Sequence, residues 1–307
     1  MPKDFWYASC GAGMIHGCRW EPVGEPRGIL QIVHGISDHA RRYDDFASHM
    51  AGHGFLVLAE DHMGHGRSGG ENTFRGYFNG GWFCAVEDTY RLLTVTRAEF
   101  PKLPYVILGH SMGSFMTQTI LQKYPGHGLD GCILCGTGWQ SHGGASAAAK
   151  LCDKICKVSG DKKPSEKLQG MLFGAYNIKV EHPRTDYDWI NRVNSDVDAY
   201  LADPLCRDPI TAGLVRDLLS GITFIQTEEN LMCMKKDLPV LIIAGGDDPV
   251  GTYGFGTRKT AQAFEDAGMM NVTTRIYPLC RHELLHEINK HEIYEDILCW
   301  IKKNLFD

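Results

Sequence analysis

Short apolar runs alternate with helical patterns along most of the chain. In the helical patterns the apolar residues recur every three or four positions, which predicts helices with one buried face. The predicted strands are residues 29–33, 55–59, 105–108, 132–135, 240–244 and 272–277, and the predicted helices are residues 39–52, 82–99, 112–124, 258–268 and 291–304. This alternation predicts an α/β fold with a mostly parallel central sheet and helices on both faces. Two further strands, near residues 4–8 and 14–20, predict an antiparallel edge.

The alternation breaks once, between the strand that ends near Cys135 and the strand that begins at Val240. About 100 residues lie between them, where one crossover helix needs about 15. They carry helical patterns at residues 144–158, 165–174, 186–193, 195–201 and 211–225 and no strand pattern. Because ligands bind beyond the carboxyl ends of parallel strands, we expect a helical cap there, residues 137–236, on a core of residues 1–136 and 237–307. A separate domain unrelated to the substrate is the alternative.

A Gly-x-Ser-x-Gly motif, residues 109–113, lies between the predicted strand at 105–108 and the predicted helix at 112–124. A strand, a sharp turn and a helix in this order push the serine outward as a nucleophile, and the glycines avoid clashes in the turn. Residues 66–70 match the same motif, but the nearest strand ends several residues earlier and no helical pattern comes after it. We therefore interpret Ser111 as the nucleophile and Ser68 as a loop serine.

A serine nucleophile needs a general base and an acid that orients the base, and in this topology they follow the serine in the order acid, histidine. Asp247 and Asp248 stand in a glycine-rich loop directly after the strand at 240–244. Asp248 is favoured because Pro249 fixes the loop beside it, and Asp247 is the alternative. His282 lies in the loop after the last predicted strand and is the candidate base.

The tetrahedral intermediate of acyl transfer needs two hydrogen-bond donors. One candidate is the backbone N–H of Met112, the residue after the nucleophile. The other is the backbone N–H of Ile36, in the loop that follows the strand at 29–33.

Two other motifs suggest different chemistry. Residues 282–286 match His-Glu-x-x-His, the pattern of zinc proteases, but His282 lies four residues past Pro278, in a strand-exit loop where a helix would be required. Cys132 and Cys135 form a Cys-x-x-Cys pair, but on a predicted strand they point to opposite faces and are explained by core packing. We therefore expect neither a metal nor a cofactor.

Composition narrows the function classes further. The formal net charge of −6 argues against a nucleic-acid surface. No run approaches the roughly 18 apolar residues of a membrane span, and the N-terminus lacks the apolar core of a signal peptide. The eleven cysteines form no framework and several lie in apolar runs, so we expect reduced, buried thiols and a cytoplasmic location.

Several segments together resemble the monoacylglycerol lipase and lysophospholipase branch of the α/β-hydrolases. They are residues 34–39 with Arg42 and Tyr43, residues 61–68, residues 109–114 and residues 280–283, and the cap segments 187–190 and 203–206 are similar to bacterial members. The resemblance spans nearly the whole chain. It implies the α/β-hydrolase fold, and it implies that the acid is Asp248, the aspartate before Pro-Val-Gly.

These observations predict a serine hydrolase that cleaves carboxylic esters of acyl glycerols or lysophospholipids through an acyl-enzyme. The expected partner is a small acyl ester, and a transient contact with a membrane surface stays open. Candidates for an acyl pocket are cap residues, which packing onto the core explains equally well: Leu151, Ile155, Leu172, Phe173 and Tyr176. The alternatives are a peptidase or amidase of the same fold and a non-catalytic binding module.

Overall fold

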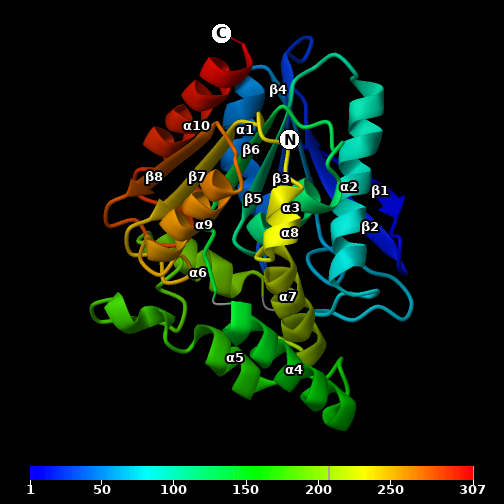
Figure 1. Ribbon diagram of the computed structural model, residues 1–307, viewed down its shortest axis with the longest axis vertical. Helices are drawn as coiled ribbons and strands as arrows, with labels where there is room; N and C mark the ends of the chain where they lie inside the picture. Colours follow the sequence, from blue (N-terminus) through cyan, green and yellow to red (C-terminus); the bar gives the residue numbers. More distant parts are fainter. Residues whose placement is uncertain (141, 207, 307) are drawn as a thin grey trace.

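The computed structural model describes residues 1–140, 142–206 and 208–306. Within these residues one sheet has eight strands in the spatial order β1-β2-β4-β3-β5-β6-β7-β8 (Figure 1). β1 pairs antiparallel with β2 and β2 antiparallel with β4, and the other pairs are parallel. The strands are β1 Lys3–Ala8, β2 Met14–Trp20, β3 Gly28–Val33, β4 Phe55–Glu60, β5 Tyr105–His110, β6 Gly131–Cys135, β7 Val240–Gly245 and β8 Val272–Tyr277.

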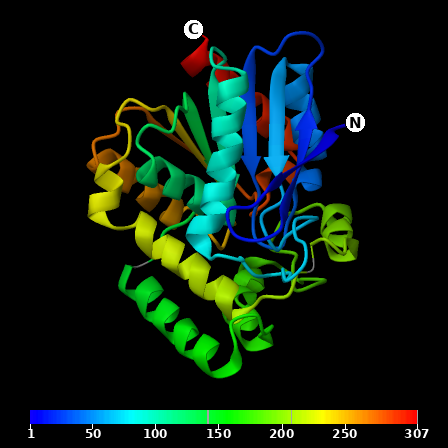
Figure 2. The same ribbon diagram turned by 90° about the vertical axis from the view of Figure 1, so that its right-hand side faces the viewer.

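Helices cover both faces of the sheet, as Figure 2 shows for α2 in front and α10 behind. The strand residues alternate between the two layers: Ile29 and Val33 of β3 pack with α2, α3 and α9, whereas Leu30 and Ile32 pack with α1 and α10. The covering helices are α1 Asp44–Gly52, α2 Trp82–Glu99, α3 Met112–Lys123, α9 Phe255–Asp266 and α10 Lys290–Leu305. The predicted α/β-hydrolase fold class is confirmed.

The order of the strands opens a crevice between β3 and β5. β3 pairs with β4 on one side and with β5 on the other, and the chain passes over opposite faces, through α1 after β3 and through α2 before β5. The loops that follow the two strands therefore diverge at the carboxyl edge of the sheet, which is where α/β proteins bind ligands. The segments around Ile36 and Ser111 lie at this point.

A long helical segment stands between β6 and β7, and we call it the cap. It contains α4 His142–Ser159, α5 Glu166–Phe173, the 3₁₀ turn η2 Tyr176–Lys179, α6 Asn194–Ala202, α7 Ala212–Ile225 and α8 Glu228–Met232. α7 contacts both α4 and α3, and α4 and α5 lie beyond the ends of the strands (Figure 1).

Three expectations about elements are corrected by the structure. The helix expected at residues 39–52 begins as a 3₁₀ turn, η1 Ala40–Tyr43, and continues as α1. The helix α3, expected to bury one face, is buried on nearly all sides, because the cap helix α7 covers the side turned away from the sheet. The helix expected at residues 186–193 is wrong. There the Asp188 carboxylate accepts hydrogen bonds from the backbone N–H groups of Arg184 and Thr185, which closes a turn in place of a helix.

The expectation that all cysteines are reduced is wrong at one pair, because Cys10 and Cys84 form a disulfide between the loop after β1 and α2. Nine other cysteines are free, and seven of these are buried. Among the described residues, none of the helices combines the length and the hydropathy that crossing a bilayer would require.

Candidate active site

Ser111 stands at the junction of β5 and α3 in a strained backbone conformation. Its φ is 54°, in the region that side chains rarely adopt, and its N–H donates to Cys135 O at 2.9 Å. The glycines on either side are required by close approach: a Cβ on Gly109 would collide with Gly113 O, and one on Gly113 would collide with Val33 O. The chain therefore turns sharply here and presents the serine at the carboxyl edge of the sheet.

His282 and Asp248 lie together in the loops after β8 and β7. His282 Nδ1 is 3.0 Å from both carboxylate oxygens of Asp248, which is fully buried and also accepts the Val250 N–H at 2.8 Å. Asp247 instead borders a separate hollow with Arg192 and Arg281. In the structure Asp248 therefore contacts His282, whereas Asp247 points to a different hollow.

The Asp248 carboxylate also sets the protonation behaviour of His282. Burial alone would lower the pKa of the imidazole, but the adjacent negative charge and the hydrogen bond outweigh it, so the pKa is raised above its ordinary value. With Nδ1–H donated to Asp248, the free nitrogen Nε2 is the one available to accept a proton. His282 and Ser111 line the same cavity.

The two candidate donors for an oxyanion flank Ser111. Met112 is the first residue of α3, where unpaired N–H groups and the helix dipole favour negative charge. Ile36 follows Gly35, whose backbone lies so near Ser111 that a Cβ there would be 3.1 Å from Ser111 Cβ. Ser37, with a φ of 52°, turns the chain away directly after Ile36.

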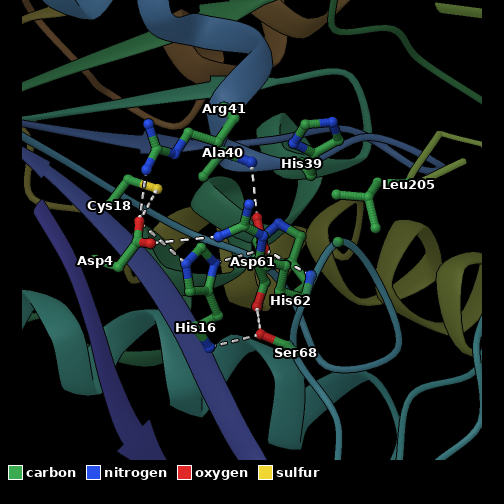
Figure 3. Close-up of polar contacts among 12 residues, drawn as sticks. Asp4, His16, Cys18, His39, Ala40, Arg41, Asp61, His62, Ser68 and Leu205 are labelled. Atoms are coloured by element: carbon green, nitrogen blue, oxygen red, sulfur yellow. Dashed lines mark hydrogen bonds and ion pairs between the residues drawn. The ribbon is translucent and has the colours of Figure 1, made fainter. Parts of the chain in front are cut away.

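The second Gly-x-Ser-x-Gly serine has a structural environment (Figure 3). Ser68 Oγ accepts the His16 N–H at 2.8 Å and donates to Asp61 O. The Asp61 carboxylate accepts the N–H groups of Ala40 and Arg67 and lies 2.8 Å from His16 Nδ1. Burial would raise the pKa of Asp61, but these bonds hold it below its ordinary value. Ser68 therefore stabilises the loop that supports η1.

Comparison with known proteins extends this picture. Residues 24–289 match the family described as serine aminopeptidase, S33. The chain is 30% identical over 302 residues to a monoacylglycerol lipase of Mycolicibacterium smegmatis, covering 97% of this chain and 96% of the relative. The chain belongs to this family of α/β-hydrolases. The hydrolase is also 28% identical to monoglyceride lipase of Mus musculus, covering 89% of this chain and 84% of the relative.

A solved structure agrees over the whole length. A carboxyl esterase from Bacillus coagulans, determined in complex with glycerol, superposes on the hydrolase with a TM-score of 0.91 at 28% identity, covering 99% of this chain and 98% of that one. The two relatives and the solved structure named here are thus lipases and an esterase. The expectation of a serine hydrolase acting on esters is confirmed by these comparisons.

The cavity of the hydrolase has a volume of about 490 Å³ and lies between Ser111 and the cap. Its apolar and aromatic wall consists of Ile36, Phe173, Tyr187, Trp189, Ile190, Tyr200, Leu201 and Ile210. Of the five residues expected in an acyl pocket, Phe173 lines it. Tyr176 packs behind Phe173 and Trp189, Ile155 and Leu172 pack against the core, and Leu151 is 49% exposed on α4.

The wall residues that the sequence did not predict lie in the cap after residue 186 and in the loop after β3, and three of them, Tyr187, Trp189 and Ile190, come from one short stretch. The helical pattern at residues 186–193 predicts that Tyr187, Trp189 and Ile190 point in different directions, whereas all three line the cavity. The similarity of residues 187–190 to bacterial members of the branch indicated that this stretch matters. It did not indicate that these side chains point into the cavity.

The rival motifs have other partners in the hydrolase. His282 is bound to Asp248 and Glu283 to Arg42, and residues 284–286 form only a three-residue 3₁₀ turn, η3 Leu284–His286. The geometry of His-Glu-x-x-His on one helix face is therefore not present in this segment. Cys132 and Cys135 are fully buried in β6, and burial raises the pKa of both thiols.

Proposed function

We propose that the hydrolase cleaves small, uncharged carboxylic esters, monoacylglycerols foremost, through an acyl-enzyme on Ser111. The observation that carries this proposal is the cavity, in which an aromatic and aliphatic wall meets Ser111 and the Asp248–His282 pair. The apolar wall offers a site for an acyl chain, and the relatives named monoacylglycerol lipase support the choice of ester.

The reaction then follows from the roles that we assign. His282 Nε2 takes the proton of Ser111 as its oxygen attacks the ester carbonyl, and the N–H groups of Ile36 and Met112 bind the resulting oxyanion. His282 returns the proton to the leaving alcohol. A water molecule activated by the same histidine then hydrolyses the acyl-enzyme.

The charges around the cavity favour an uncharged head group. Three carboxylates line the cavity: those of Asp38 and Glu283 pair with the Arg42 guanidinium, at 3.3 and 2.6 Å, and that of Asp208 pairs with the Arg75 guanidinium. A lysophospholipid phosphate would meet these carboxylates, and an aminopeptidase substrate would need a free carboxylate for its α-ammonium group. Both considerations favour monoacylglycerols over lysophospholipids and over peptides.

A substrate panel tests the proposal. We expect kcat/KM to be highest for a medium-chain monoacylglycerol, about tenfold or more lower for the matching lysophosphatidylcholine, and lower still for aminoacyl amides. The measurement is initial hydrolysis rate with each substrate below its aggregation concentration. Faster turnover of the amides would contradict the proposal, and the Ser111→Ala variant supplies the background rate.

We further propose that exposed apolar side chains of the cap contact lipid surfaces transiently. Val158, Met171 and Ile178 are 86%, 65% and 78% exposed, and α4, which carries Val158, also carries the exposed lysines Lys150, Lys154 and Lys157. Apolar side chains among lysines favour the surface of an anionic bilayer. In flotation with phosphatidylserine-containing vesicles, the wild type should be recovered in the vesicle fraction, and V158D/I178D should be recovered there in a smaller amount. Equal recovery of both proteins would contradict the proposal.

For the compartment we propose the cytoplasm. The nine free cysteines support a reducing environment, and the Cys10–Cys84 disulfide argues in the other direction. Cell fractionation followed by immunoblotting measures the location directly. Recovery of the protein outside the cytoplasmic fraction would contradict the proposal.

A further inference from the structure

Glu283, the residue after the candidate base, is buried and holds a charge. The Arg42 guanidinium donates to its two carboxylate oxygens at 2.6 and 2.8 Å, and only 9% of the Arg42 side chain and 5% of the Glu283 side chain are exposed. Burial would raise the pKa of Glu283, but the guanidinium overcomes this and holds the pKa far below its ordinary value. The two groups therefore form a buried ion pair with two hydrogen bonds.

Arg42 also reaches the loop that carries one candidate oxyanion donor. It contacts Asp38 Oδ1 at 3.3 Å, and the hydroxyl of the neighbouring Tyr43 donates to Asp38 Oδ2 at 2.8 Å. Asp38 stands two residues after Ile36. The adjacent side chains of Arg42 and Tyr43 in η1 therefore both bind the Asp38 carboxylate and so hold the loop after β3 in place.

Glu283 connects the same guanidinium to the histidine loop and to the cap. Its N–H donates to Ile190 O at 2.6 Å, and Asn191 Nδ2 donates to its carboxylate at 3.1 Å. The Arg42 guanidinium also lies over the ring of Tyr200 in α6, 4.9 Å from the centroid. The ion pair thus joins the loop after β3, the loop after β8 and the cap.

We propose that Arg42 and Glu283 are a positioning pair that fixes the oxyanion loop and the candidate base His282 relative to each other. The pair touches neither reacting atom in the assigned mechanism. It acts because a general base and an oxyanion donor must both be placed within a fraction of an ångström of Ser111, and the two loops that carry them come from opposite ends of the chain. This inference rests on the proposed roles of Ile36, Ser111 and His282.

A double variant separates positioning from simple stability. Arg42→Met alone leaves the buried Glu283 carboxylate without its cation and should lower the melting temperature. R42M/E283L removes both charges of the pair and should recover part of that loss, while Asp38 keeps its hydrogen bond from the Tyr43 hydroxyl. We expect kcat of the double variant on p-nitrophenyl butyrate to stay about 10- to 100-fold below wild type, with KM changed less than about threefold. R41M is the matched control, since Arg41 lies in the same turn and pairs with Asp4, and it should keep wild-type kcat.

The outcomes are distinct. A folded double variant with kcat within twofold of wild type would overturn the inference, because the pair would then be purely structural. If the double variant does not fold, Glu283→Gln decides, with an expected loss in kcat of about tenfold and an overturning result of unchanged kcat. If the wild type is neither labelled at Ser111 by a fluorophosphonate nor active on esters, the proposed function fails, independently of the variants.

Discussion

Replacing Ser111 by alanine should lower kcat for ester substrates by about 10⁴- to 10⁶-fold and abolish labelling by a fluorophosphonate probe. The reason is that the proposed acyl-enzyme can form only on this oxygen. The residual activity would be hydrolysis by water, supported by the oxyanion donors and by substrate binding. Stopped assays with a p-nitrophenyl ester and intact-protein mass spectrometry of the labelled enzyme measure both effects.

The control is built into the sequence, because Ser68 stands in the second match to the same motif. Ser68→Ala should keep kcat within about threefold of wild type and retain labelling. It should instead lower the free energy of unfolding by about 1–3 kcal/mol, since the buried His16 N–H loses its acceptor. Labelling that depends on Ser68 and persists in Ser111→Ala would reverse the two assignments.

Replacing Asp248 by asparagine should lower kcat/KM by about 10⁴-fold without removing the shape of the side chain. The amide cannot hold the imidazole in the tautomer that frees Nε2, and it does not stabilise the imidazolium. Because the carboxylate raises the pKa of His282, its loss should also move the acidic limb of the kcat/KM profile to lower pH. A pH–rate series from acid to neutral measures the shift.

Asp247→Asn is the paired variant, one residue away in the same loop. Its side chain borders the hollow that contains Arg192 and Arg281, so we expect kcat/KM within about threefold of wild type. The opposite ranking of the two variants would identify Asp247 as the acid and would mean that the loop after β7 rearranges when substrate binds.

The sequence was sufficient for the fold because the strands are short, apolar and regularly spaced. Each of β3 to β7 is buried along its whole length, so its hydrophobic run is readable without any neighbour. These hydrophobic runs do not determine the order of the strands in the sheet. The structure shows that β3 lies between β4 and β5, which opens the crevice.

For the site, the sequence predicted residues at strand ends and failed for residues held by long-range contacts. Ser111, Asp248 and His282 each follow a readable strand, so topology alone brings them to one edge. Glu283 pairs with a residue 241 positions away, and no local pattern encodes that distance. In the cap stretch at residues 186–193 both causes act: the Asp188 carboxylate closes a local turn, and backbone carbonyls of the stretch accept hydrogen bonds from the histidine loop.

The hydrogen bonds between that stretch and the histidine loop also bear on protein engineering. Ile190 O accepts the Glu283 N–H, and Asp188 O and Asn191 O accept the Arg281 guanidinium at 2.6 and 3.0 Å. A chimera that exchanges residues 137–236 as a block would therefore import a foreign support for its own base. Crossover points that leave residues 187–193 with the recipient would keep the native support of its histidine loop. Exchanging only the helices before them would then change the pocket at Gln169 and Phe173, the two lining residues that those helices carry.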